Sequence, residues 1–125
     1  MDLDKKHAFI HADESKSKRP IAVPLNKQAI SILKDQRGKN PTYVFTYKDN
    51  PVTRCNNHAW QKALKRAGIN NFRWHDLRHT WASWHVQNRT PLHELQQLGG
   101  WSNYEMVLRY AHLSSAHLRA AAERV

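Results

Sequence analysis

Glycine and proline residues divide this chain into short segments, and this division constrains its fold more than any other feature. Gly38 with Pro41, Gly68, Pro91 and the pair Gly99-Gly100 border stretches in which apolar residues recur at helical spacing. Glycine readily takes the left-handed conformation that ends a helix, and proline suits the first turn of one. The sequence therefore predicts a series of short helices.

The beginning of the chain, residues 6–24, predicts a β-hairpin. Residues 8–10 and 21–23 are short apolar runs, and the polar run 13–18 between them is the expected turn. Pro24 is expected to end the second strand.

The remaining part, residues 26–125, predicts helices with one more extended piece at residues 43–45. Asn26 is the expected N-cap of a first helix and Thr53 that of a second, which Gly68 ends. Later helices are expected over residues 75–88 and 91–98, from Ser102 or Asn103 through Met106, Val107 and Tyr110, and over the tail 114–125. The predicted fold class is mainly α with a small antiparallel β-hairpin at the N-terminal end (α+β), as a single domain of residues 1–125.

The charge of the chain favours a polyanionic partner. Its 125 residues carry a formal net charge of +10, from 20 lysines and arginines against 10 acidic residues, and each cation placed on a phosphate releases condensed counterions. Cys55 is the single cysteine, which excludes a disulfide framework and a CxxC metal pair. No apolar run approaches the roughly 18 residues of a membrane span. We therefore expect a cytoplasmic protein that contacts no membrane.

The stretch RWHDLRHTWASW, residues 73–84, combines an apolar and a basic set of side chains on one predicted helix. At about 100° per residue, Leu77, Trp81 and Trp84 cluster on one side and predict a buried stripe. His75, Arg78 and His79 cluster on another face, which we expect to look outward.

Histidine and arginine side by side suit either a metal site or a phosphate site. His75 and His79 stand at i and i+4 as in a zinc-protease helix, but Asp76 replaces the expected Glu, and no third ligand has a characteristic spacing. Arginine binds two phosphate oxygens at once, and His75 and Arg78, at i and i+3, meet one phosphate from the same face. The phosphate interpretation fits better, and we expect no metal and no other cofactor.

Downstream motifs give this interpretation partners, and together they resemble the tyrosine recombinase (phage integrase) family. The family pattern has a His-x-x-Arg on a helix, then an LGH- or GW-type element, then a tyrosine nine residues after that His or Trp. This chain has His75 and Arg78, then the run LGGWS around Trp101, then Tyr110. Upstream, DESKSKRPIAVPLN resembles the family's β-hairpin, in which a lysine at the turn precedes a strand ending Val-Pro-Leu. The resemblance covers nearly the whole chain.

The resemblance implies site-specific DNA recombination or integration without metal or ATP. Tyr110 would attack a DNA phosphodiester and form a 3′-phosphotyrosyl bond, and Arg78 would meet the charge developing on the non-bridging oxygens. The other implied catalytic residues are His75, as proton acceptor or phosphate ligand, Lys16, as general acid to the departing 5′ oxygen, and Trp101, as a contact of the phosphate. Basic residues beside this set are expected to bind double-stranded DNA: Lys18, Arg73, His79 and Arg109. Lys18 is also the second choice for the turn lysine.

The chain departs from the family pattern in one respect. The family has an earlier catalytic arginine before the hairpin, whereas no arginine precedes Arg19 here. We therefore expect an N-terminally incomplete catalytic domain that is inactive or nearly so by itself, because a phosphate contact of several kcal/mol is lost. The principal alternative is a non-catalytic DNA-binding remnant of a prophage integrase; a tyrosine-type topoisomerase and a metal-dependent hydrolase fit less well. The tail helix, with Leu118 and several alanines, packs either on its own chain or on a second copy, so a dimer or a higher oligomer on DNA is expected.

Overall fold

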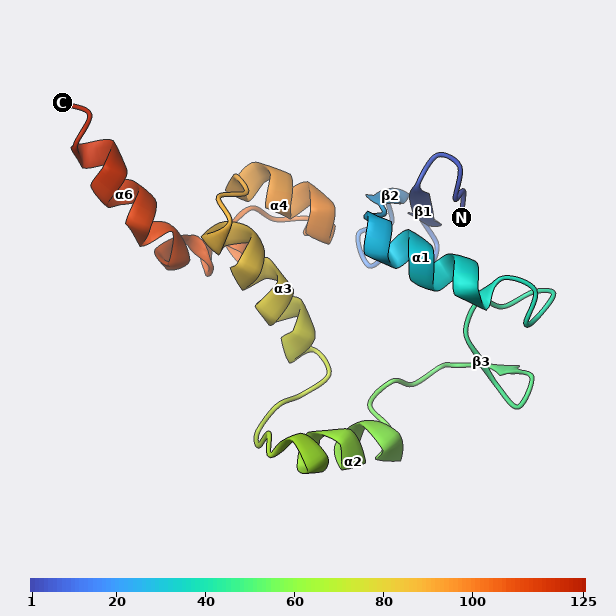
Figure 1. Ribbon diagram of the computed structural model, residues 1–125. Helices are drawn as coiled ribbons and strands as arrows, with labels where there is room; N and C mark the ends of the chain where they lie inside the picture. Colours follow the sequence, from blue (N-terminus) through green and yellow to red (C-terminus); the bar gives the residue numbers. More distant parts are fainter. The chain divides into compact units, whose positions relative to one another are not determined.

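The computed structural model describes residues 1–114 and 118–125 in full, and of residues 115–117 only the backbone. The chain divides into two compact units, Met1–Phe72 (unit 1) and Arg73–Val125 (unit 2). Figure 1 colours the chain from blue at the start of unit 1 to red at the end of unit 2. That the two units form the single domain expected from the sequence stays a prediction.

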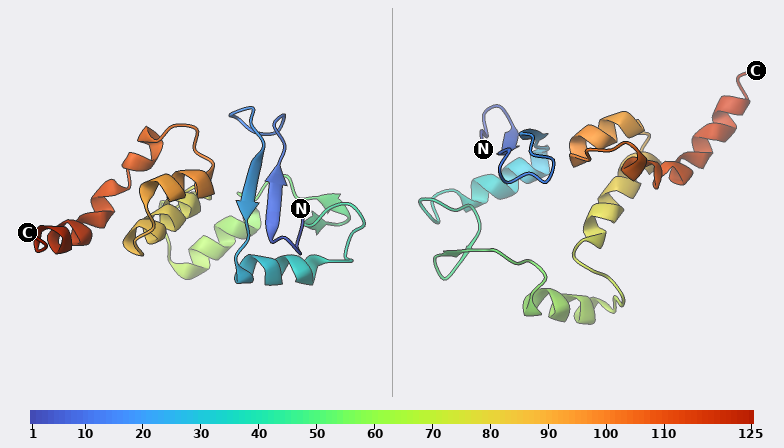
Figure 2. Two further views of the ribbon diagram at one scale, coloured as in Figure 1. Left: turned by 90° about the horizontal axis from the view of Figure 1, so that it is seen from above. Right: turned by 180° about the vertical axis from the view of Figure 1, so that it is seen from behind.

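Unit 1 begins with the predicted hairpin. Strand β1 (His7–Ile10) pairs antiparallel with β2 (Ile21–Pro24), and His7 lies opposite Pro24 at one end of the ladder. Figure 2 shows the two strands as neighbouring arrows. In the loop between them Ser15 is buried and its hydroxyl shares a 2.8 Å hydrogen bond with that of Ser17. The hairpin prediction is confirmed.

Helix α1 (Lys27–Gln36) follows the hairpin directly. The Asn26 side chain accepts a 2.8 Å hydrogen bond from the backbone N–H of Ala29, as its predicted N-cap role requires.

The prediction of a strand at residues 43–45 is wrong, because the extended piece lies just after it. Strand β3 (Thr46–Tyr47) pairs with β4 (Asn50–Pro51). Lys48 and Asp49 join them in left-handed conformations, with φ of 49° and 63°. Such a two-residue turn matches the twist of a hairpin and determines which residues pair.

Helix α2 (His58–Ala67) completes unit 1, and its start also differs from the prediction. Thr53 is not the N-cap: Asn57 is, and its side chain accepts a 3.0 Å hydrogen bond from the N–H of Trp60. Both residues are good caps by type, so only the point at which the chain turns decides between them. Gly68 ends the helix in the left-handed conformation, as predicted.

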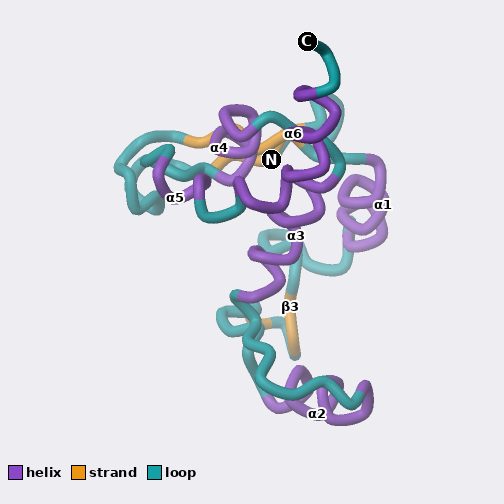
Figure 3. The backbone as a smooth tube through the Cα atoms, turned by 90° about the vertical axis from the view of Figure 1, so that its left-hand side faces the viewer, coloured by secondary structure: helices purple, strands orange, loops and turns teal.

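Unit 2 consists of helices joined by short loops in the part that the structure describes (Figure 3). These are α3 (Asp76–Gln87), α4 (Leu92–Gly99), α5 (Glu105–Leu108), a 3₁₀ turn (Ala111–Ser114) and α6 (Ser115–Ala122). The helices predicted over residues 75–88, over 91–98 and in the tail are confirmed.

The placement of Tyr110 within a helix is wrong. Helix α5 ends at Leu108, and the chain then tightens into i→i+3 hydrogen bonds, one of 3.0 Å from the N–H of Tyr110 to the carbonyl of Val107. Tyr110 therefore lies in a turn, and this turn directs its side chain toward α3.

The core of unit 2 differs from the predicted stripe on α3. Leu77 and Trp84 are 41% and 64% exposed, whereas Ala82 and Val86, four residues apart on another face, are buried. Helix α3 packs against α4 and the 3₁₀ turn, and the small Ala82 side chain allows this close approach. Trp81 packs on the edge of a core that also contains Leu95, Val107 and Tyr110. Of the three predicted positions, only Trp81 belongs to the core.

Within the described part of the chain, no helix combines the length and the apolar character needed to cross a membrane.

Candidate active site

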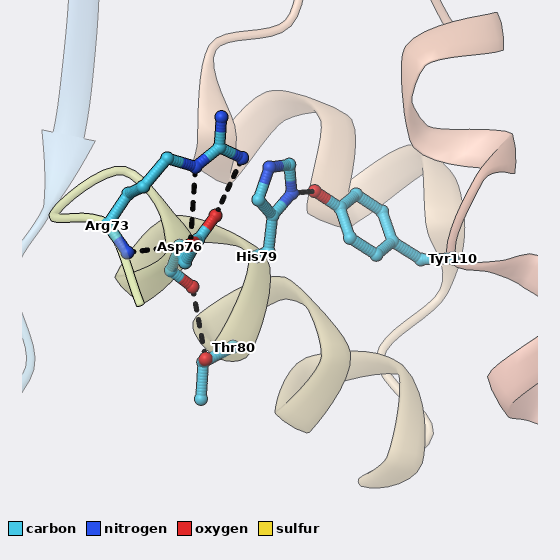
Figure 4. Close-up of polar contacts among 5 residues, drawn as sticks. All are labelled: Arg73, Asp76, His79, Thr80 and Tyr110. Atoms are coloured by element: carbon cyan, nitrogen blue, oxygen red, sulfur yellow. Dashed lines mark hydrogen bonds and ion pairs between the residues drawn. The ribbon is translucent and has the colours of Figure 1, made fainter. Parts of the chain in front are cut away.

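The first turn of α3 is held by Asp76. Its carboxylate accepts the backbone N–H of Arg73 at 2.8 Å and the Arg73 guanidinium at 3.0 Å (Figure 4). The hydrogen bonds from the Arg73 side chain and backbone hold the pKa of the Asp76 carboxyl below its usual range, and the charges of Arg73 and His79 act in the same direction. A carboxylate at a helix N-terminus also interacts favourably with the helix dipole. The start of α3, and with it the positions of His75 and Arg78, is therefore anchored.

Arg78 joins α3 to the end of α4. Its Nη2 donates a 2.6 Å hydrogen bond to the carbonyl oxygen of Gly99, and its guanidinium carbon lies 4.2 Å from the centre of a Trp101 ring. These two contacts hold the planar cation in a defined orientation. The prediction that Arg78 and His79 look outward is wrong, because the end of α4 and the Tyr110 turn pack against this face of α3.

The two glycines before Trp101 each meet a different steric requirement. Gly100 is left-handed, with φ of 65°, and ends α4. A Cβ atom on Gly99 would overlap the Trp101 indole ring. The Gly-Gly-Trp sequence is therefore what allows the indole to fold back over the end of α4.

Tyr110 lies beside His79 and Trp101. The residue is 5% exposed, and its hydroxyl lies 2.6 Å from Nδ1 of His79 (Figure 4). Its ring centre is 6.0 Å from that of Trp101, which in turn stacks on Trp81 at 6.2 Å. Aromatic packing thus holds the ring, and one imidazole holds the hydroxyl.

The structure brings four of the sequence-predicted residues into one contact set, which we call the α3–Tyr110 cluster: Arg78, His79, Trp101 and Tyr110. His75 borders it, exposed at the N-cap position of α3, with its ring centre 5.2 Å from that of His79. Arg73 is ion-paired and Arg109 is exposed in the turn after α5. Lys16 and Lys18 are exposed in the β1–β2 loop and belong to unit 1.

Sequence reasoning missed two parts of the cluster, the Gly99 carbonyl that accepts from Arg78 and the Trp81 ring under Trp101. The glycine pair before Trp101 was the available signal for the first. No local signal indicates the second, because Trp81 reads equally well as an ordinary core residue.

The chemistry of the cluster is that of an anion site beside a nucleophile. A guanidinium binds phosphate oxygens in a planar fork, and a phenol hydroxyl held by imidazole is positioned for proton transfer. Among the side chains that the structure describes, no three His, Cys, Asp or Glu residues group as a metal site requires.

Comparison with known proteins agrees with this chemistry. The sequence profile of the family described as Phage integrase family matches residues 1–117. The chain is 47% identical to the integrase of Salmonella phage P22, with 100% of this chain and 36% of that protein aligned. It is 31% identical to the integrase of Haemophilus phage HP1, with 86% of this chain and 29% of that protein aligned. The chain thus spans about a third of the length of these relatives.

A solved structure shares the fold. The catalytic domain of bacteriophage HP1 integrase superposes with a TM-score of 0.65 at 25% sequence identity, covering 96% of this chain and 65% of that one. The predicted fold class, mainly helical with small antiparallel sheets, is confirmed by this likeness.

Proposed function

Because the chain belongs to the phage integrase family, we propose that it serves site-specific DNA recombination by cleaving and rejoining strands through Tyr110. The observation that carries the proposal is the α3–Tyr110 cluster. Arg78, Trp101 and Tyr110, which lie up to 32 positions apart in the sequence, meet there, and their order resembles the family pattern. The ring of Tyr110 and the guanidinium of Arg78 both lie near Trp101: the Tyr110 and Trp101 ring centres are 6.0 Å apart, and the guanidinium carbon is 4.2 Å from a Trp101 ring centre.

In the proposed reaction the Tyr110 oxygen attacks a DNA phosphorus atom and the P–O5′ bond breaks. The products are a 3′-phosphotyrosyl bond and a free 5′-hydroxyl, which later attacks the same phosphorus and restores the DNA. Arg78 stabilises the charge on the non-bridging oxygens, and such preorganised contacts are usually the largest contribution to catalysis. Trp101 either donates a hydrogen bond from its indole N–H to the phosphate or packs its ring against it.

Lys16 is the proposed general acid that gives its proton to the departing 5′ oxygen. An exposed lysine in a hairpin loop can reach a bound strand, and the loop is anchored by the buried Ser15 next to it. His75, exposed at the start of α3, is the proposed phosphate ligand. Lys18, Arg73, His79 and Arg109 are the further residues proposed to bind DNA.

Double-stranded DNA is the proposed substrate, met in the cytoplasm by a dimer or a higher oligomer. The net charge of +10 supports a polyanionic partner. Leu118 is 69% exposed on α6, which supports packing of this helix on a second copy of the chain.

By itself this chain is proposed to be inactive or nearly so in strand cleavage, since the given sequence has no arginine before Lys16 to supply a second phosphate contact. The alternative function is that of a DNA-binding protein without turnover. A suicide substrate distinguishes the two, because a nicked duplex loses the released fragment and accumulates even slow covalent products.

The experiment incubates the 125-residue chain with nicked duplexes of randomised sequence. We expect a slowly accumulating protein–DNA adduct that survives denaturation and that the Tyr110→Phe variant does not form. A retarded but fully denaturable complex in both proteins would replace the proposal by the DNA-binding alternative.

A further inference from the structure

The recombination proposal leaves open which group takes the hydroxyl proton of Tyr110, and the contact between His79 and Tyr110 bears on this question. An attacking phenol must lose its proton, and the group that takes it must lie within about 2.6–3.2 Å of the hydroxyl. His79 Nδ1 lies 2.6 Å from Tyr110 Oη. His75, the histidine of the His-x-x-Arg motif, has no hydrogen bond to Tyr110 among those that the structure describes; its ring contacts His79 instead.

The His79 imidazole is held in place from two sides. The backbone of His79 lies within α3, where its carbonyl accepts a 2.8 Å hydrogen bond from the Ser83 hydroxyl. Its ring packs at 6.0 Å against the ring of Tyr110 and at 5.2 Å against that of His75. The imidazole is therefore preorganised toward the tyrosine hydroxyl.

A carboxylate lies near His79 on the same helix. The Asp76 carboxylate stands one turn earlier on α3, and the charges of Asp76 and His79 interact. His75, which faces the same ring from the first turn, is exposed, so water screens any charge it carries.

We propose that His79 is the catalytic base of strand cleavage: its Nδ1 accepts the hydroxyl proton of Tyr110 as the tyrosine oxygen attacks phosphorus. The Oη–H bond breaks, an N–H bond forms on His79, the P–Oη bond forms and the P–O5′ bond breaks. The 5′ oxygen takes its proton from an acid, for which Lys16 is the candidate. In rejoining, the imidazolium returns the proton to Oη. This inference rests on the proposed function and leaves His75 free to contact the phosphate.

The first test does not need DNA. An Nδ1 that accepts must be unprotonated, with the proton on Nε2. In a long-range ¹H–¹⁵N spectrum of the ¹⁵N-labelled chain, assigned by loss of the signal in His79→Asn, we expect His79 Nδ1 as the unprotonated nitrogen. A proton on Nδ1 would make His79 a donor to Tyr110, and the proposal would be overturned.

The second test measures the rate of adduct formation on the nicked duplexes. Asparagine places an amide near the position of Nδ1, so His79→Asn keeps a hydrogen-bonding partner but cannot take the proton. We expect it to keep the unfolding midpoint of the parent chain while forming adduct about 100-fold more slowly, as loss of a general base implies. Added imidazole should restore part of the rate to His79→Ala.

The matched control is His93→Asn, which changes an exposed histidine on α4 in the same way and should leave the rate unchanged. A His79→Asn rate within twofold of the parent would rule out His79 as the base. If the parent and all variants form no adduct, the proposed recombination activity fails, and the nitrogen spectrum alone decides whether His79 can take the proton.

Discussion

Replacing Arg78 by lysine tests whether the guanidinium shape, and not only its charge, organises the α3–Tyr110 cluster. The substitution keeps one positive charge on a long side chain but removes the planar fork. In the structure that fork serves two contacts at once, the 2.6 Å hydrogen bond to the Gly99 carbonyl and the 4.2 Å stacking contact on Trp101. A lysine ammonium can satisfy one of these contacts from a given position, not both.

The size of the effect follows from these two contacts. A hydrogen bond from a charged group contributes about 1.5–3 kcal/mol, and a cation over an indole about 0.5–2 kcal/mol. Arg78 is half-buried, so both contributions lie toward the lower part of their ranges. Because lysine retains one contact in part, we expect Arg78→Lys to lower the free energy of unfolding by about 1–2 kcal/mol.

The assay is urea denaturation followed by tryptophan fluorescence, since Trp101 and Trp81 stack within the cluster. Arg66→Lys is the matched control, because Arg66 is exposed near the end of α2 in unit 1, and surface substitutions of this kind change stability by less than about 0.5 kcal/mol. If Arg78→Lys is as stable as Arg66→Lys, the two contacts do not order the cluster, and the reasoning is refuted.

Three further substitutions test the fold around the site. Gly99→Ala forces a Cβ into the Trp101 indole, so it should cost about 1–3 kcal/mol of stability and shift the tryptophan emission; unchanged emission would contradict the close approach. Leu95→Ala empties a fully buried position and should cost about 2–5 kcal/mol in the same urea assay, and a smaller loss would mean that the core is not closed there. Asp76 has a lowered pKa in the folded chain, so the stability that its carboxylate contributes is present at neutral pH and is lost as the pH falls through that lowered pKa. The difference in unfolding free energy between the parent chain and Asp76→Asn should therefore narrow below about pH 4. A difference that does not change with pH would show that the contact with Arg73 is not ionic.

Local patterns in the sequence predict most helices and the front hairpin, because caps and stops act within a few residues. Asn26 caps the start of α1 by accepting a hydrogen bond from the N–H of Ala29, and Gly68 ends α2 by taking the left-handed conformation. Thr53 and residues 43–45 show the limit of this reasoning. Several cap-forming and β-forming residues lie close together there, and the left-handed turn at Lys48 and Asp49 selects among them.

The composition of the site follows from the sequence better than its geometry does. Motif order identifies Arg78, Trp101 and Tyr110 as a group, but helical periodicity places the buried face of α3 at Leu77 and Trp84, both of which are exposed. Helical periodicity gives most weight to large apolar residues. The face of α3 that is buried in the structure contains the small Ala82, which lets α4 and the 3₁₀ turn approach. His79 and Tyr110 are 31 residues apart in the sequence. Their contact depends on which face of α3 is buried, so no local sequence pattern predicts it.

The most direct test of the account is the site at which the chain becomes joined to DNA. Trypsin cuts after Arg109 and Arg119, so the peptide of residues 110–119 contains Tyr110 as its single tyrosine. After incubation with nicked suicide duplexes, nuclease and trypsin, mass spectrometry should find a nucleotide phosphate on Tyr110 of this peptide. DNA attached at any other residue, or DNA bound by the chain with peptide 110–119 always unmodified, would contradict the account.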